Sequence, residues 1–260
     1  MNDIKDVIEQ FAKIPNLSDF KNPLFIGPHP DDIEFGCGAL IYDMVKKGAT
    51  PHFLIVTDGA AGTDDPAYSP SKLRDKRKEE AMVASEFLGA KSCDFLELED
   101  GGIYLSEDVT RLIAPYVLKY LPDVIFTCDP NLRSECHSDH IKTGEGVRAV
   151  TQIIGYPEAL RRHNIKIDGF KVFPRNITLV YYFTDDPNHF EPVSKEGLNA
   201  KTKALLFHES QMVSDEMKML VHYFSLKAEM DGAKIQVPLA ESYQVIVPVC
   251  QHVYSQGLHY

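Results

Sequence analysis

The sequence contains no apolar run that approaches the ~18 residues needed to cross a membrane as a helix. Its first 14 residues, MNDIKDVIEQFAKI, also lack the apolar core and the cleavage site of a secretory signal peptide. They follow instead an acidic, amphipathic pattern, which predicts a helix within residues 1–20. We therefore expect a cytoplasmic protein with no membrane partner.

Cysteine is scarce and follows no binding pattern. The five cysteines are odd in number, and no two of them are spaced as CxxC. The sequence therefore predicts neither a disulfide framework nor a structural zinc knuckle, and most of the thiols are expected to be buried. Cys37 and Cys136 flank the two polar clusters described below, so a thiolate metal ligand at either position stays open as an alternative.

Positive charge is in deficit. The chain has 27 Lys and Arg residues against 38 Asp and Glu residues, which gives a formal net charge of −11 and a pI near 5.3. No basic patch interrupts this balance, which argues against nucleic acid and anionic membranes as partners. With 44% hydrophobic residues in a chain of 260, the composition fits one large domain.

Apolar segments alternate with amphipathic segments, a pattern typical of a mostly parallel sheet covered by helices on both faces. We therefore expect a single Rossmann-like, three-layer α/β domain with its core at about residues 22–247 and a tail at 248–260. The expected strands are residues 23–28, 51–57, 93–98, 124–128, 177–183 and 242–247. The expected helices are residues 38–47, 71–88, 106–120, 139–154, 195–207 and 214–230.

Two segments between these elements lack a regular pattern. Residues 60–71 are rich in Gly, Asp, Pro and Ser, which predicts an exposed loop at the rim of a substrate site. Residues 155–174 form a basic segment without a regular pattern, which predicts either a solvated insertion or a lid.

The most informative polar cluster follows the first expected strand. His29, Asp31 and Asp32 lie in the segment HPDD, directly after apolar residues and before a glycine-rich helix start. In an open α/β sheet, ligands bind beyond the carboxyl ends of the strands, so this placement favours a catalytic metal site. In the alternative interpretation, the turn is an ordinary helix entry in which an aspartate caps free amides.

A second cluster follows the expected strand at residues 124–128, where His137 and His140 lie in the segment HSDH. An open catalytic zinc site needs three protein donors and a water, and His29, Asp32 and one of these two histidines supply that set. Asp31 is adjacent to Asp32 and cannot easily point the same way. One carboxylate is therefore expected to bind the metal while the other faces the metal-bound water.

These segments resemble, in their order and spacing, the LmbE-like or PIG-L family of zinc-dependent de-N-acetylases. The matching segments are HPDD, TDG at 57–59, RKEEA at 77–81, LGA at 88–90, HSDH at 137–140 and KALLFHESQ at 203–211. Within the family the chain is most similar to bacterial deacetylases of N-acetylglucosamine conjugates, of the bacillithiol-pathway and diacetylchitobiose types. The resemblance implies one deacetylase domain over residues 1–260, which releases acetate and a free amine from an N-acetylated amino sugar.

The resemblance also implies a role for each residue of the two clusters. His29, Asp32 and His140 would hold one Zn²⁺ per chain, and Asp31 would be the general base. His137 would stabilise the oxyanion or protonate the leaving amine. Another divalent metal, such as iron or manganese, stays possible, since affinity order alone does not decide occupancy.

Three further residues have both a functional and a structural interpretation. Asp139 either orients His137 or stabilises the start of a helix. Arg77 matches a substrate-side arginine of the family, but it also fits a solvated charge that pairs along its helix. Asp100 matches a position that contacts sugar hydroxyls, and otherwise belongs to a turn. His208 is expected to be structural.

The chain departs from the family pattern at two places. Ile33 interrupts the usual HPDDE, so the acid arrives as Glu34 and the expected ligands are unaffected. Glu135 stands where some relatives carry a tyrosine, so a tyrosine that polarises the substrate carbonyl would have to be Tyr181 or Tyr182.

Two alternatives concern function, and one expectation concerns assembly. The chain could hydrolyse a non-sugar amide or an ester, or it could be a non-catalytic metal-binding or sugar-binding protein. Asp31 argues against the last alternative, because a binding protein needs no free carboxylate beside the metal. A homo-oligomer, a trimer or hexamer, is expected by analogy alone.

Overall fold

A computed structural model of the chain describes residues 12–63, 65–212 and 214–252. Most of the helix expected within residues 1–20 and most of the tail at 248–260 lie outside these ranges. The described part of the N-terminal segment contains a short 3₁₀ turn, η1 (Leu17–Asp19). In the ranges described, no helix has both the length and the apolar character of a membrane span.

The described residues form a seven-stranded sheet in the order β3-β2-β1-β4-β5-β7-β6. The strands are β1 (Pro23–Gly27), β2 (His52–Thr57), β3 (Ser92–Leu98), β4 (Val124–Cys128), β5 (Thr178–Tyr182), β6 (His189–Pro192) and β7 (Ala240–Ile246). Strands β1 to β5 are parallel to one another, and β7 runs antiparallel to β5 and β6. The predicted mostly parallel α/β sheet is thus confirmed.

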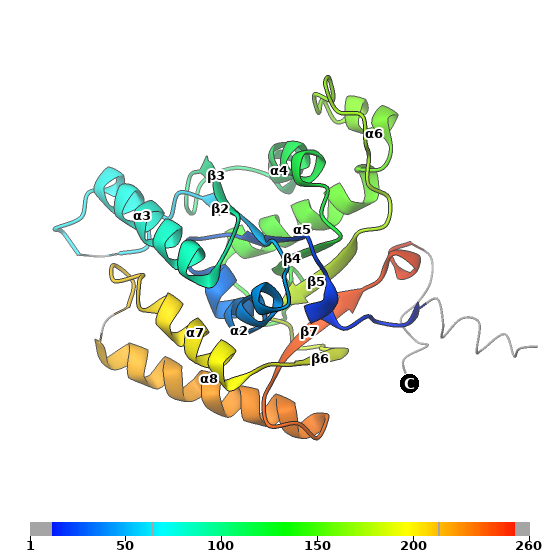
Figure 1. Ribbon diagram of the computed structural model, residues 1–260. Helices are drawn as coiled ribbons and strands as arrows, with labels where there is room; N and C mark the ends of the chain where they lie inside the picture. The colour runs from blue at the N-terminus through cyan, green and yellow to red at the C-terminus, as the bar shows by residue number, and fades with distance from the viewer. Residues whose placement is uncertain (1–11, 64, 213, 253–260) are drawn as a thin grey trace, which may run out of the picture.

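Helices cover both faces of this sheet (Figure 1). They are α2 (Asp32–Lys46), α3 (Pro70–Leu88), α4 (Ser106–Tyr120), α5 (Ser138–Ile153), α6 (Pro157–Arg162), α7 (Lys195–Leu205) and α8 (Ser214–Lys234), with a 3₁₀ turn η2 (Pro248–Cys250) near the C-terminus. One core lies between the sheet and α2, α3 and α7, and a second lies between the sheet and α4 and α5. The three layers agree with the predicted architecture.

Strand β1 shows why its sequence is apolar at every position. Phe25 faces one core, where its ring stacks on Phe126 with centroids 4.5 Å apart. Leu24 and Ile26 face the other core and are fully buried. A central parallel strand has no solvent face, so both sets of side chains must be apolar.

Helix α2 begins at Asp32, six residues before the predicted start at Gly38. The glycines that suggested a helix start lie inside the helix, where other elements approach closely. A Cβ built on Gly36 would lie 2.5 Å from the ring of Tyr182, and one on Gly38 would lie 2.9 Å from Cγ of Lys201. These glycines therefore serve packing, and the prediction of the helix start was wrong.

Two elements were not predicted. Strand β6 has only four residues, ends in proline and lies at the edge of the sheet, so it carries little periodic signal. Helix α6 lies within the expected irregular segment at 155–174 and begins with Pro157, a residue suited to the first helical position.

The sheet order places the two polar clusters together. β1 lies between β2 and β4, and the chain moves from β1 to one half of the sheet before returning to β4 on the other side. This reversal makes a topological switch point, where a crevice forms beyond the carboxyl ends of the two strands. HPDD follows β1 and HSDH follows β4, so both border this crevice.

Candidate metal centre and active site

The turn after β1 brings His29 and Asp32 into contact. The Asp32 carboxylate accepts a hydrogen bond from the backbone N–H of His29 at 2.9 Å, and its Oδ2 lies 3.2 Å from His29 Nδ1. Asp32 is the first residue of α2, where the positive end of the helix dipole stabilises a carboxylate. The local fold thus holds one imidazole and one carboxylate in a fixed relation.

His140 joins this pair from the first turn of α5. Its Nε2 lies 3.4 Å from Oδ2 of Asp32, and the donor atoms of His29, Asp32 and His140 all lie within 4.8 Å of one another. In a tetrahedral site with bonds of about 2.1 Å, neighbouring ligand atoms lie about 3.4 Å apart. The two measured distances are close to this value, so these donors fit a divalent metal ion.

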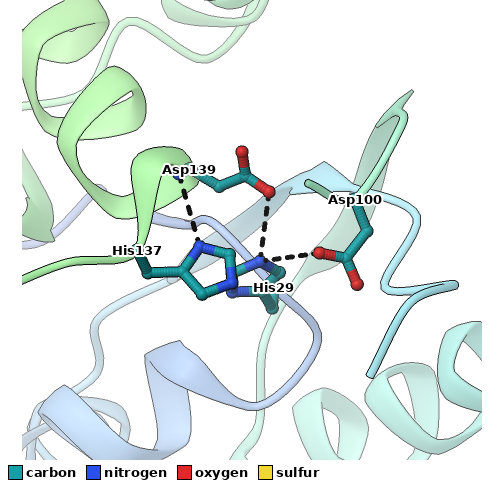
Figure 2. Close-up of side chains that lie close together, drawn as sticks. All are labelled: His29, Asp100, His137 and Asp139. Carbon is teal, nitrogen blue, oxygen red and sulfur yellow. Dashed lines mark hydrogen bonds and ion pairs between the residues drawn. The ribbon is translucent and has the colours of Figure 1, made fainter. Parts of the chain in front are cut away.

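The second nitrogen of His29 faces two carboxylates from other strand ends. His29 Nε2 lies 3.3 Å from Oδ1 of Asp100, which follows β3, and 3.4 Å from Oδ2 of Asp139, at the start of α5 (Figure 2). Carboxylates in this position keep the proton of a metal-bound histidine on the far nitrogen. They would therefore leave the Nδ1 lone pair of His29 free for a metal.

The same residues form a second convergent group. Donor atoms of His29, Asp100, His137 and Asp139 also lie within 4.8 Å of one another (Figure 2). The two groups share His29, through Nδ1 in the first and Nε2 in the second. The second group also has an explanation without a metal, because Asp100 and Asp139 can both accept the His29 N–H.

The charges around His29 favour a cation. Burial opposes a charged imidazole, but Asp100, Asp139 and Asp32 together raise the pKa of His29 to about 12. Burial alone would raise the pKa of Asp32, yet His140 and His29 hold it well below its usual range. A metal ion held by the same donors would supply the positive charge that these carboxylates stabilise, and its binding would displace the protons.

Asp31 occupies a strained position beside the expected ligands. Its φ of +128° lies in a region that L-residues rarely adopt, and such strain tends to persist at functional sites. Burial raises the pKa of Asp31 to about 6, and the charge of Arg77 opposes that shift. A carboxylate that exchanges a proton near neutral pH suits a general base.

Arg77 fixes this strained turn from α3. Its Nη2 donates to the carbonyl oxygen of Pro30 at 2.9 Å and to Oδ2 of Asp31 at 3.3 Å, while Nη1 donates to the Gly59 carbonyl at 3.1 Å. Only 4% of Arg77 is exposed, so it is not the solvated charge of the alternative interpretation. It holds the chain around Asp31.

His137 lies at the N-cap of α5 with its edge toward the His29 ring, the centroids being 4.5 Å apart. Burial and the neighbouring His29 lower the pKa of His137, although the residue remains exposed. Among the described residues, the Asp139 carboxylate does not contact His137, although such a contact is one of the two roles considered for it. The Asp139 carboxylate points to His29 and accepts the Gly101 N–H at 2.8 Å, whereas only the backbone N–H of Asp139 reaches His137 Nδ1, at 3.4 Å.

Glu135 is a site residue that the sequence interpretation missed. Its Oε2 lies 2.9 Å from Nδ1 of His140, and its Oε1 accepts the backbone N–H of His137 at 2.7 Å. It thus lies against the His140 ring and holds the HSDH turn. Its only sequence signal is its position two residues before His137.

Three other expectations concern the surroundings of the site. Tyr181 and Tyr182 do not supply the missing carbonyl contact: both are buried in the core, and the Tyr182 hydroxyl donates to the Ile26 carbonyl at 2.9 Å. Among the described residues, no cysteine belongs to either donor group, and Cys37 is fully buried in the core. His208 is also fully buried, with Nε2 3.5 Å from Glu34.

A mostly parallel α/β sheet that brings histidine and aspartate donors together at its switch point is the arrangement of an enzyme with a candidate metal site, and comparisons with known proteins identify the class as deacetylases. The model of the PIG-L family, GlcNAc-PI de-N-acetylase, matches residues 24–151. Diacetylchitobiose deacetylase of Thermococcus kodakarensis is 30% identical over 239 residues, which cover 91% of this chain and 87% of that protein. The chain belongs to the PIG-L/LmbE family of de-N-acetylases, as the sequence motifs predicted.

Two further comparisons extend this result. The 1D-myo-inositol 2-acetamido-2-deoxy-α-D-glucopyranoside deacetylase of Kineococcus radiotolerans is 27% identical over 178 residues, covering 56% of this chain and 49% of that protein. The structure of N,N′-diacetylchitobiose deacetylase from Pyrococcus horikoshii superimposes with a TM-score of 0.85 at 24% identity, over 98% of this chain and 97% of that one. The second comparison shows a shared fold.

Proposed function

We propose that this protein is a zinc-dependent hydrolase that removes the N-acetyl group from an N-acetylglucosamine-type amino sugar or glycoconjugate. The observation that carries this proposal is the convergence of His29, Asp32 and His140 beside the carboxylate of Asp31, which does not belong to the donor group. A metal site with three protein donors keeps a position for water, and the adjacent carboxylate can accept a proton from that water. The names of the related deacetylases support an amino-sugar substrate.

The proposed metal site uses His29 Nδ1, Asp32 Oδ2 and His140 Nε2, one ion per chain. A bound zinc would lower the pKa of its water to ~7 and polarise the substrate carbonyl. Asp100 and Asp139 would fix the His29 ring, and Glu135 would fix the His140 ring. All three residues therefore act through the histidines that they orient.

Asp31 is the proposed general base. Arg77 keeps its carboxylate at the crevice through the contact at 3.3 Å and, by holding the Pro30 carbonyl, maintains the strained turn. Amide hydrolysis also needs a proton donor for the leaving nitrogen, because an amide anion is a poor leaving group and a neutral amine is a better one. His137 is the proposed donor of that proton, and it is the exposed member of the cluster.

The sugar is proposed to lie on the side of β2 and β3. Asp100 lines this side, and its Oδ2 accepts the Ala61 N–H at 3.0 Å, which ties the loop after β2 to the site. Arg77 lies beneath the same loop at Gly59. We propose that these two residues shape the wall that receives the sugar hydroxyls.

The test is acetate release by zinc-reconstituted protein from N-acetylglucosamine, diacetylchitobiose and an N-acetylglucosaminyl malate. Asp31→Asn should abolish turnover while the zinc content measured by elemental analysis stays at one ion per chain. Asp19→Asn, a change of an exposed aspartate outside the site, is the matched control. Absence of acetate release from every sugar by metal-loaded protein would contradict the proposed substrate class, and protein that binds no zinc would contradict the proposed site.

A further inference from the structure

A cavity of about 350 Å³ lies next to the candidate metal centre, under α8 and beside the ends of β5 and β7. Two of the residues that line it also contact the expected ligand His140. The Glu135 carboxylate lies 2.9 Å from His140 Nδ1, and the ring of Phe183 is stacked on the His140 ring with centroids 6.2 Å apart. The cavity is therefore separated from the candidate metal centre by the His140 ring, on the side of Glu135 and Phe183.

The walls of the cavity are mainly apolar. Helices α2, α7 and α8 and the loops after β4 and β5 contribute aromatic and aliphatic side chains. These residues are Phe35, Leu132, Phe183, Leu198, Phe224 and Ala228. An apolar pocket of this size matches the general character of small-molecule sites.

The charged groups in the cavity already have partners. Lys201 Nζ lies 2.7 Å from Oε1 of Glu241, and Glu241 also accepts a backbone hydrogen bond from α2. Lys227 pairs with Asp231 and donates to Ser242 Oγ at 2.7 Å. These charges satisfy one another, so the cavity favours an uncharged apolar occupant over an ionic one.

The cavity lies on the opposite side of the metal centre from the polar wall. Asp100 follows β3 on one side of β1, whereas Phe183 follows β5 on the other. The carbonyl carbon of the substrate amide is bonded to the nitrogen that carries the sugar (the sugar arm) and to the acyl chain (the acyl arm). The proposed function directs the sugar arm toward Asp100. The acyl arm then points toward the cavity beside Phe183.

We propose that this cavity binds the acyl chain of the substrate, so that the enzyme hydrolyses N-acyl amino sugars with linear chains longer than acetyl. The proposal rests on the proposed function, because it assigns the two arms of the same amide. A methyl group, about the size of one water (~30 Å³), would leave most of the cavity unfilled. A longer chain would replace water along the apolar walls, with an affinity gain of about fourfold per methylene.

The reaction has the same balance for any chain length. The oxygen of water bonds to the carbonyl carbon, the carbon–nitrogen bond breaks, and the nitrogen takes up a proton. The products are a carboxylate that carries the chain and a free amino sugar. No oxidant, reductant or further reactant is needed.

The first experiment measures binding of acetate, hexanoate and octanoate to the zinc-loaded protein by isothermal titration calorimetry. We expect affinity to rise with chain length by about fourfold per methylene. Ala228→Phe, which fills the cavity from α8, should abolish this rise, and Leu132→Trp should do the same from the loop after β4. Ala233→Phe, on the exposed side of α8, is the matched control and should retain the rise.

The second experiment compares hydrolysis of N-acetylglucosamine with that of N-hexanoylglucosamine. The expected result is a lower KM for the hexanoyl substrate, and a ratio of kcat/KM for hexanoyl over acetyl that falls at least tenfold in Ala228→Phe. Thermal melting of each variant identifies one that fails to fold, and the second cavity variant then decides.

The outcomes separate the two proposals. Acetyl hydrolysis without any chain-length dependence of carboxylate binding refutes the acyl cavity and leaves the proposed function intact. Chain-length-dependent binding that the cavity variants abolish, with no hydrolysis of any substrate, supports the cavity and refutes the function. Diacetylchitobiose binding that depends on Ala228, with no such dependence for octanoate, shows that the cavity takes the sugar arm and overturns the proposal.

Discussion

The contact between Asp139 and His29 makes a quantitative prediction about metal affinity. The Asp139 side chain is fully buried, its Oδ2 lies 3.4 Å from His29 Nε2, and the same oxygen accepts the Gly101 N–H at 2.8 Å. On the other side of the Asp139 carboxylate, the Lys142 ammonium lies 3.7 Å from Oδ1. In Asp139→Asn, the side-chain NH₂ group must therefore face either the N–H groups of His29 and Gly101 or the Lys142 ammonium. Neither orientation satisfies all the donors around the side chain.

The size of the effect follows from the same distances. A full charge pair at 3.4 Å is worth about 5 kcal/mol at an effective dielectric constant of about 20. The Asp100 carboxylate still lies 3.3 Å from His29 Nε2, so only part of this stabilisation is lost. We expect zinc affinity to fall about 10-fold to 100-fold, which is about 1.4 to 2.7 kcal/mol.

The assay is zinc competition against a chromophoric chelator, with thermal melting of the apo protein in parallel. Glu191→Gln is the control, because Glu191 is a buried carboxylate that bonds to η1 and His189, outside the site. It should lower stability and leave zinc affinity unchanged. Zinc affinity within twofold of the wild type in Asp139→Asn would refute the reasoning that this carboxylate fixes the His29 ring.

Three further predictions follow from contacts described above. In Arg77→Lys, the single ammonium cannot make the forked contacts of the guanidinium with Asp31 and the two carbonyls. The value of kcat/KM should therefore fall about tenfold or more while the zinc content stays unchanged, and normal activity would contradict the positioning role. Gly36→Ala places a methyl group against the Tyr182 ring and should lower the free energy of unfolding by about 1–3 kcal/mol in urea titrations, and an unchanged midpoint would contradict this close packing. Burial opposes ionisation of Glu191, but the hydrogen bonds that its carboxylate accepts lower its pKa below the ordinary value of 4.5. The wild type should therefore be more stable than Glu191→Gln by its full margin above pH 4.5, and this margin should shrink as the pH falls below that value. A difference in melting temperature that does not change with pH would refute this linkage.

The sequence predicted the central strands because they are buried on both faces. Residues such as Leu24 and Phe25 have no polar neighbour within the strand, and a continuous apolar run bounded by turns is a strong signal. The same reasoning placed HPDD and HSDH after two strands. Their meeting in one crevice then followed from the way parallel strands share a carboxyl edge.

Details that depend on packing between distant segments were harder to predict. A glycine in the sequence signals either a turn or a close approach, and only the position of Tyr182 shows that Gly36 is of the second kind. The direction of the Asp139 carboxylate depends on where the loop after β3 passes. The role of Glu135 depends on the conformation of the loop after β4, for which no periodic pattern exists.

His29 connects parts of the chain that are far apart in sequence. Its own loop follows β1, Asp100 comes from the loop after β3, and Asp139 and His140 come from the start of α5. None of these neighbours is within reach of His29 until the sheet has assembled in the order observed. An unfolded chain therefore offers a metal ion only the separate segments HPDD and HSDH, and most of the free energy of metal binding is added to the stability of the native sheet.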